Sequence, residues 1–364
     1  MVSATAIATR LKNLRASLRS QGLDAMIVMD RMNTIYFTGF ECSYSILIVD
    51  ARSAVFITDS RYGEAAEKAL QKFKVRIQPT KNVREFLTKL FKSLGYGTAG
   101  YEGDITVDQF DEMRKWTRGT KLKKAGDLIT KLRRVKDAEE IETIKRAVAM
   151  GDKLMEYAMT LLKPGTTELV ISQSVRFQAE RLGASAESFR NIIASGPNSS
   201  RPHHHPGRRK LRKGDPVTVD LGVIYEGYCS DLTRTPVLGK PSRKFEEIYY
   251  VCLAANQEAI KAIRPGMTGA EADQVARNVI EEAGYGEYFG HGLGHGVGLQ
   301  IHEEPRLSPR ATKYALEPGN IVTIEPGIYL PGVGGVRIED YAVVTERGAQ
   351  VLSRSPKQLR IIPA

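Results

Sequence analysis

The fold is decided by the stretch Leu211-Arg-Lys-Gly-Asp-Pro-Val-Thr-Val-Asp-Leu-Gly222, which recurs as Leu316-Glu-Pro-Gly-Asn-Ile-Val-Thr-Ile-Glu-Pro-Gly327. In each copy a glycine turn leads into a β-branched run, the composition of a strand. Each run ends in an acid, so that Asp220 aligns with Glu325. The two stretches therefore predict two equivalent strands, each carrying a carboxylate at its end.

The similarity extends beyond these two strands. Leu162-Lys-Pro-Gly-Thr-Thr167 resembles Ile263-Arg-Pro-Gly-Met-Thr268, and Gly227–Asp231 aligns with Gly335–Glu339. Copies of roughly 100 residues are too long to be units of a solenoid, so we interpret them as two halves of one domain. Helical patterns alternate with strands joined as hairpins. We expect an α+β fold, a curved antiparallel sheet backed by helices, with an internal pseudo-two-fold repeat.

The aligned acids predict a metal site. Packing the two halves face to face brings four carboxylates into one crevice: Asp220, Asp231, Glu325 and Glu339. Converging carboxylates repel one another unless a cation neutralises them. All six histidines lie in two stretches, 203–205 and 291–302, which indicates that both stretches contribute to that site. Carboxylates with imidazole suit Mn²⁺, Co²⁺, Fe²⁺ or Zn²⁺, and two ions about 3.5–4 Å apart need bridging acids.

Each acid taken alone has a simpler interpretation, because an Asp at a strand end followed by Gly is usually a turn residue. The combination of repeat, acid pairing and clustered histidines favours the metal site. Three neighbouring residues are not expected to be ligands. We expect His204 and His205 to point into solvent, and Asp340 to support the ligands from outside or to lie on the surface.

The chain divides into two predicted domains, 1–130 and 131–364. The first reads as alternating helices and strands, with helices at Ala6–Gln21 and Glu64–Phe73 and a hairpin formed by Ser45–Asp50 and Ala54–Thr58. It contains no histidine, so we expect it to shape the site or an oligomer interface. The second begins where Asp137 and Glu140 can form a capping box.

Composition excludes several classes of protein. The chain is 42% hydrophobic and 26% charged, which is ordinary for a globular protein. The first fifteen residues lack the apolar core of a secretory signal, and no run approaches the ~18 apolar residues that span a bilayer. Three widely spaced cysteines fit reduced thiols and a cytoplasmic location. The net charge of +11 comes without interleaved aromatics, so we interpret it as a solvated basic surface and expect no nucleic-acid partner.

Three motifs carry a family resemblance: Gly290-His-Gly-Leu-Gly-His-Gly-Val-Gly-Leu-Gln-Ile-His-Glu-Glu-Pro305, Ile324-Glu-Pro-Gly-Ile-Tyr329 and Gly335-Val-Arg-Ile-Glu-Asp340. Together they resemble the motifs of the pita-bread metallopeptidases. Residues 1–130 resemble the N-terminal domain of the creatinase, prolidase and aminopeptidase P branch. The resemblance implies this α/β domain followed by a catalytic pita-bread domain.

The resemblance also implies roles for individual residues. The ligands of two divalent ions would be Asp220, Asp231, His295, Glu325 and Glu339, with Mn²⁺ favoured over Co²⁺ or Zn²⁺. Glu325 would also take a proton from the bridging water, and His203 and His302 would act on substrate and transition state. His291 would lie beside the substrate, and Arg337 would support the ligand cluster.

The implied activity is hydrolysis of the Xaa-Pro bond, a tertiary amide that most peptidases reject. Prolidase, which cuts Xaa-Pro dipeptides, is favoured because Arg306 stands where prolidases carry an arginine for the proline carboxylate. The alternative is aminopeptidase P, which acts on longer peptides. A metal-free pita-bread binding protein is a third possibility, against which the five retained ligands speak. We expect a homodimer and no association with membranes.

Overall fold

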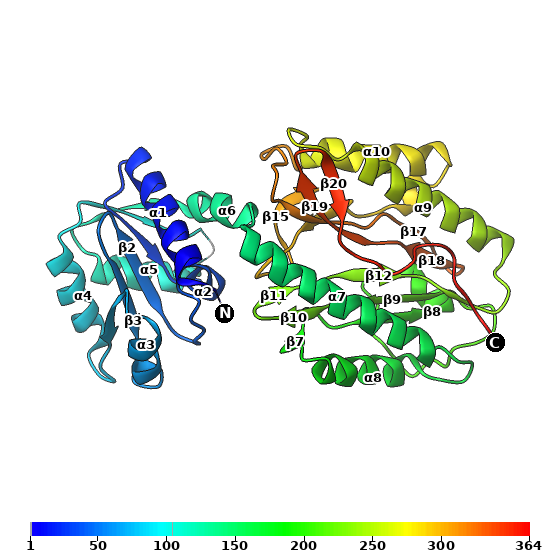
Figure 1. Cartoon of the computed structure of the whole chain (residues 1–364), viewed down its shortest axis with the longest axis horizontal. Helices are drawn as coiled ribbons and strands as arrows, with labels where there is room; N and C mark the ends of the chain where they lie inside the picture. Colours follow the sequence, from blue (N-terminus) through cyan, green and yellow to red (C-terminus); the bar gives the residue numbers. More distant parts are fainter. Residues whose placement is uncertain (1, 104) are drawn as a thin grey trace. The chain divides into compact units, whose positions relative to one another are not determined.

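The computed structural model describes residues 2–103 and 105–364, and its chain divides into two compact units between Arg133 and Arg134 (Figure 1). The sequence-based boundary, after residue 130, stays a prediction. Each unit is described by itself.

The first unit is built on one six-stranded sheet in the order β4-β3-β2-β1-β5-β6. Its strands are β1 (Ala25–Val28), β2 (Ile46–Asp50), β3 (Ala54–Thr58), β4 (Lys74–Ile77), β5 (Thr98–Tyr101) and β6 (Lys121–Lys124). Its helices are α1 (Ala4–Ser20), α2 (Arg31–Thr38), α3 (Gly63–Ala69), α4 (Val83–Leu94), α5 (Val107–Trp116) and α6 (Gly126–Arg134). The predicted hairpin is confirmed, because β2 and β3 pair antiparallel. The predicted helix from Glu64 ends at Ala69 and not at Phe73, because Leu70 leaves helical geometry and is buried.

The second unit contains two helix pairs with strands between them (Figure 1). The first pair is α7 (Ala138–Leu161) and α8 (Glu168–Arg181), and the second is α9 (Arg243–Ala262) and α10 (Gly269–Glu282). The capping box predicted for α7 is confirmed, with Asp137 accepting from the Glu140 amide and the Glu140 carboxylate accepting from the Asp137 amide. Each pair covers its own apolar core. One core is formed with β8 (Ile192–Ser195) and β9 (Val217–Leu221), and the other with the strands from β16 (Ile321–Ile324) to β19 (Asp340–Thr345).

The first copy of the repeat holds seven strands: β7 (Ala186–Glu187), β8 (Ile192–Ser195), β9 (Val217–Leu221), β10 (Val223–Tyr225), β11 (Tyr228–Cys229), β12 (Leu232–Arg234) and β13 (Val237–Leu238). The second copy holds β14 (Gly294–Gly296), β15 (Glu303–Leu307), β16 (Ile321–Ile324), β17 (Gly327–Leu330), β18 (Gly334–Arg337), β19 (Asp340–Thr345), β20 (Gly348–Val351) and β21 (Ile361–Ile362). In the first copy β9 lies between β8 and β12, and in the second β16 lies between β14 and β19, all antiparallel.

Equivalent backbone hydrogen bonds confirm the internal repeat. The Gly165 amide donates to the Leu211 carbonyl, as the Gly266 amide does to the Leu316 carbonyl, both over 2.9 Å. The turn glycines before the two strands also match, since Gly214 and Gly319 have φ of 88° and 91°. An L side chain is strained in that region, so each turn needs its glycine. The two stretches that align in sequence are thus equivalent in structure.

Candidate metal centre

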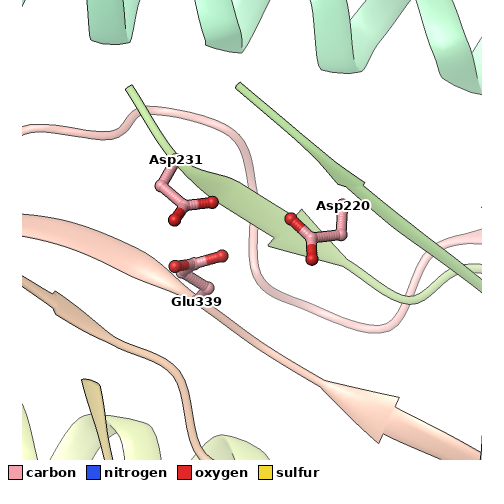
Figure 2. A group of neighbouring side chains, drawn as sticks. All are labelled: Asp220, Asp231 and Glu339. Atoms are coloured by element: carbon pink, nitrogen blue, oxygen red, sulfur yellow. The ribbon is translucent and has the colours of Figure 1, made fainter. Parts of the chain in front are cut away.

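Three carboxylates from separate segments converge in the second unit. Asp220 lies in β9, Asp231 immediately precedes β12, and Glu339 immediately precedes β19. One oxygen of each lies within 4.8 Å of the other two, and Figure 2 shows the three carboxyl groups gathered between the strands. All three are buried. The register of β9 with β12, which pairs Asp220 with Thr233, and the bond from the Glu339 amide to the Thr233 carbonyl bring these segments together.

The hydrogen bonding of these acids leaves room for a cation. Asp220 Oδ2 accepts from Arg337 Nη2 over 2.5 Å, and Glu339 Oε2 accepts from Thr233 Oγ1 over 2.8 Å. The other oxygens, Asp220 Oδ1 and Glu339 Oε1, are the buried carboxylate oxygens in the described part of the chain that accept no hydrogen bond. A buried polar atom without a partner is costly, and a metal ion would satisfy both.

Electrostatics supports the same interpretation. Burial first, and then the neighbouring carboxylates, raise the pKa of Asp231 and of Glu339 well above the ordinary range. Without a cation these acids resist ionisation, since like charges in a buried site repel one another. A divalent ion reverses this by stabilising the carboxylates. The residues therefore fit divalent metal.

His295 and Glu325 lie at the edge of this cluster. His295 Nε2 is 3.3 Å from Glu325 Oε1 and 3.7 Å from Asp231 Oδ2. Burial, and then His302, lower the pKa of His295 to about 3, so the ring is neutral. Its Nδ1–H donates to the Gly296 carbonyl over 3.1 Å, which leaves the Nε2 lone pair facing the acids, as a metal ligand requires.

Glu325 immediately follows β16, the strand equivalent to β9. Thr323 Oγ1 donates to its Oε1 over 3.1 Å. Burial raises the pKa of Glu325 to about 7, with Asp220 contributing in the same direction. Each half of the repeat thus supplies acids to one site, as the alignment predicts.

These groups open on one cavity of about 520 Å³. Every residue to which the sequence assigns a role lines it: His203, Asp220, Asp231, His291, His295, His302, Arg306, Glu325, Arg337 and Glu339. His203 and His302 are exposed, and the rings of His302 and His295 meet edge to face with centroids 4.3 Å apart. The geometry brings the whole predicted set together.

A hydrogen-bonded chain that the sequence did not predict runs behind the cavity wall. Arg337 Nη1 donates to the Tyr329 hydroxyl over 2.8 Å, and that hydroxyl lies 2.9 Å from His291 Nε2. His291 Nδ1 donates to the Gly292 carbonyl, and burial lowers the pKa of His291 to about 4. A neutral ring protonated on Nδ1 must accept from Tyr329 through Nε2. The chain therefore fixes the tautomer of His291.

The expectation for His204 is wrong. It does not point into solvent: its Nε2 lies 2.8 Å from Oε2 of the fully buried Glu168, while His205 is exposed as expected. The error arises because Glu168 is distant in sequence. Of the two places expected for Asp340, the surface is excluded. Asp340 is 1% exposed and forms ion pairs with Arg234, at 3.0 Å, and with Lys357.

Two known families of protein domains match the two parts of the chain separately. Residues 10–135 match the creatinase/prolidase N-terminal domain, and residues 142–346 match metallopeptidase family M24. The chain is 35% identical to the Xaa-Pro dipeptidase of Pyrococcus horikoshii, covering 96% of this chain and 98% of that protein.

Two solved structures resemble it along nearly the whole length. The Xaa-Pro dipeptidase from Bacillus anthracis superposes with a TM-score of 0.93 at 38% identity, covering 98% of this chain and 99% of that one. The X-Pro aminopeptidase from Thermotoga maritima superposes with a TM-score of 0.88 at 34% identity, covering 95% of this chain and 100% of that one. The described helices include none long and apolar enough to cross a membrane. With its creatinase-type N-terminal domain and pita-bread catalytic domain, the chain belongs to metallopeptidase family M24 and is a peptidase.

Proposed function

We propose that the protein is an Xaa-Pro dipeptidase that uses two divalent ions, with Mn²⁺ preferred over Co²⁺ or Zn²⁺. The observation that carries the proposal is the buried carboxylate cluster with two unpartnered oxygens on the wall of a 520 Å³ cavity. The ligands would be Asp220, Asp231, His295, Glu325 and Glu339. The same unpartnered oxygens speak against a metal-free binding protein.

The bound ions would supply a water whose pKa falls from about 15.7 to about 7. Glu325 would accept its proton. His203 and His302, on opposite halves of the repeat, would donate hydrogen bonds to the scissile carbonyl as it gains negative charge. Arg337 would hold Asp220 in place, and His291 would present its ring to the substrate from the cavity wall.

Arg306 favours the dipeptidase over the aminopeptidase. It is exposed, it lines the cavity, and its guanidinium makes no ion pair within the described residues. A planar guanidinium matches a carboxylate, and in an Xaa-Pro dipeptide the proline itself carries the terminal carboxylate. The similarity to an X-Pro aminopeptidase keeps hydrolysis of longer peptides as the alternative.

We also propose that the protein is a homodimer in a reducing, cytoplasmic compartment. The three cysteines support the proposed compartment, because all are buried and none forms a disulfide within the described residues. We keep 1–130 and 131–364 as the proposed domain limits.

The deciding assay compares Ala-Pro with Ala-Pro-Gly in the presence of Mn²⁺ or Co²⁺. We expect faster cleavage of Ala-Pro, abolished by a chelator and restored by metal. Preferred cleavage of the tripeptide would establish the aminopeptidase, and chelator-insensitive or absent cleavage of both would refute a metallopeptidase acting at proline.

A further inference from the structure

Three arginines line the cavity, and they differ in what they contact. Arg337 is bound to Asp220 and to Tyr329. Arg190 and Arg306 are exposed, and within residues 2–103 and 105–364 neither guanidinium has an ion-pair or hydrogen-bond partner. The four acids of the lining are the three carboxylates of the cluster and Glu325 at its edge. The cavity wall therefore presents two cations with no anion assigned to them by the protein itself.

The two free arginines come from opposite halves of the repeat. Arg306 lies in β15, in the second copy. Arg190 lies in the first copy, between β7 and β8, two residues before Ile192, which pairs directly with Asp220. Its neighbour Asn191 is buried and donates from Nδ2 to the Ser172 carbonyl over 3.2 Å, which anchors the backbone beside Arg190. The cation is thus carried on a fixed backbone close to the carboxylates.

Arg306 and Arg190 would face different ends of a bound dipeptide. If the proline carboxylate pairs with Arg306 on the second half, the residue before proline extends toward the first half, where Arg190 stands. A neutral side chain there leaves the guanidinium to solvent. A carboxylate there forms an ion pair with it, whereas an ammonium is repelled.

We propose that Arg190 is a specificity-determining residue that favours substrates with Glu or Asp before proline. The inference rests on the proposed function, since it takes the scissile bond to be Xaa-Pro. Because Arg190 is exposed, its pair with the substrate is screened by water, and the preference is about two- to fivefold rather than absolute.

The test compares kcat/KM of the metal-loaded enzyme for Glu-Pro, Gln-Pro, Lys-Pro and Ala-Pro. The unmodified enzyme should prefer Glu-Pro to its neutral isostere Gln-Pro, with the difference in KM. Arg190→Gln should abolish the preference, lowering kcat/KM for Glu-Pro more than for Ala-Pro. Arg190→Glu should reverse it in favour of Lys-Pro. High salt should shrink the preference, because about 1 M salt shortens the screening length to about 3 Å.

Arg208→Gln is the matched control, since Arg208 is an exposed arginine outside the cavity lining. It should behave as the unmodified enzyme. Equal rates on Glu-Pro and Gln-Pro, or equal losses on all four substrates in Arg190→Gln, would overturn the role of Arg190 while Ala-Pro cleavage still stands. Failure to cleave Ala-Pro at all would instead refute the proposed function.

Discussion

Glu168 and His204 are joined by a hydrogen bond of 2.8 Å between Oε2 and Nε2. Glu168 begins α8, and its fully buried carboxylate also accepts from the amide and hydroxyl of Ser195, the Asn198 side chain and the Gly207 amide. Burial alone would raise the pKa of Glu168, but these hydrogen bonds outweigh it and lower the pKa. One carboxylate therefore secures both ends of the loop that carries His203 to the cavity.

Glu168→Gln should impair catalysis through this loop. The NH₂ group of glutamine would face hydrogen-bond donors that now donate to the Glu168 carboxylate. The loss of these hydrogen bonds would cost about 1.5–3 kcal/mol of folding stability. We expect kcat on Ala-Pro to fall while bound metal stays unchanged, because no ligand is touched. His204→Gln should show a milder loss. His205→Gln is the control and should resemble the unmodified enzyme, since His205 is exposed; indistinguishable His204 and His205 variants would argue against the anchoring role.

Asp231→Asn should have opposite effects on the metal-free and metal-loaded proteins. Burial and the neighbouring acids raise the pKa of Asp231, so removing its charge relieves repulsion and raises the Tm of the metal-free protein. In the loaded protein one of the proposed metal ligands would be lost, and losing several kcal/mol of charge stabilisation costs about a thousandfold in kcat. Thermal unfolding with chelator measures the change in Tm of the metal-free protein. Cleavage of Ala-Pro measures the change in kcat of the loaded protein, and elemental analysis gives its metal content.

Asp340→Asn is the matched control for this prediction. Asp340 is equally buried, but it pairs with Arg234 and Lys357 and not with the cluster. Its loss should destabilise both forms, because it leaves the buried Arg234 and the partly buried Lys357 without their carboxylate, and should leave the metal content unchanged. A similar loss of metal in both variants would remove Asp231 from the ligand set.

The contribution of Glu325 to the stability of the metal-free protein should fall as pH rises toward neutrality. The pKa of Glu325 is about 7 in the fold against an ordinary 4.5, so over that window this carboxyl binds more protons in the folded than in the unfolded state. Its contribution to folding stability then decreases with pH, whereas the lowered pKa values of His291 and His295 act in the opposite direction. The Tm of Glu325→Gln without metal should therefore gain on that of the unmodified protein between about pH 5 and pH 7. Thermal unfolding of both proteins at a series of pH values checks this, and a Tm difference that does not change with pH would contradict it.

Arg306→Ala should raise KM for Ala-Pro and barely affect cleavage of longer peptides. A charge-assisted pair of about 1.5–3 kcal/mol corresponds to about a ten- to hundredfold loss in kcat/KM. Arg306→Lys should recover part of it, because lysine keeps the charge without the planar fork. Arg310→Ala, an exposed arginine outside the cavity lining, serves as control. Equal losses on dipeptides and tripeptides would mean that Arg306 serves structure instead.

Local patterns in the sequence were sufficient for the framework. The turn glycines Gly214 and Gly319, each followed by a β-branched run, predict the two equivalent strands because backbone geometry and side-chain periodicity act over a few residues. The acids at the strand ends predict the shared site because equivalent halves place equivalent residues alike. The capping box at Asp137 and the hairpin of β2 and β3 follow from local rules in the same way.

The tertiary structure alone decided which polar groups meet. His204 reaches Glu168 across 36 residues, and Asp340 reaches Arg234 across 106. Tyr329 joins Arg337 to His291, and Arg190 lines the cavity through the pairing of β8 with β9. A polar side chain has no periodic signal that names its partner, because its energy depends on burial and on what else is buried beside it. The sequence determined the two strands and their acids, whereas the packing of the two halves determined how those acids and histidines are held.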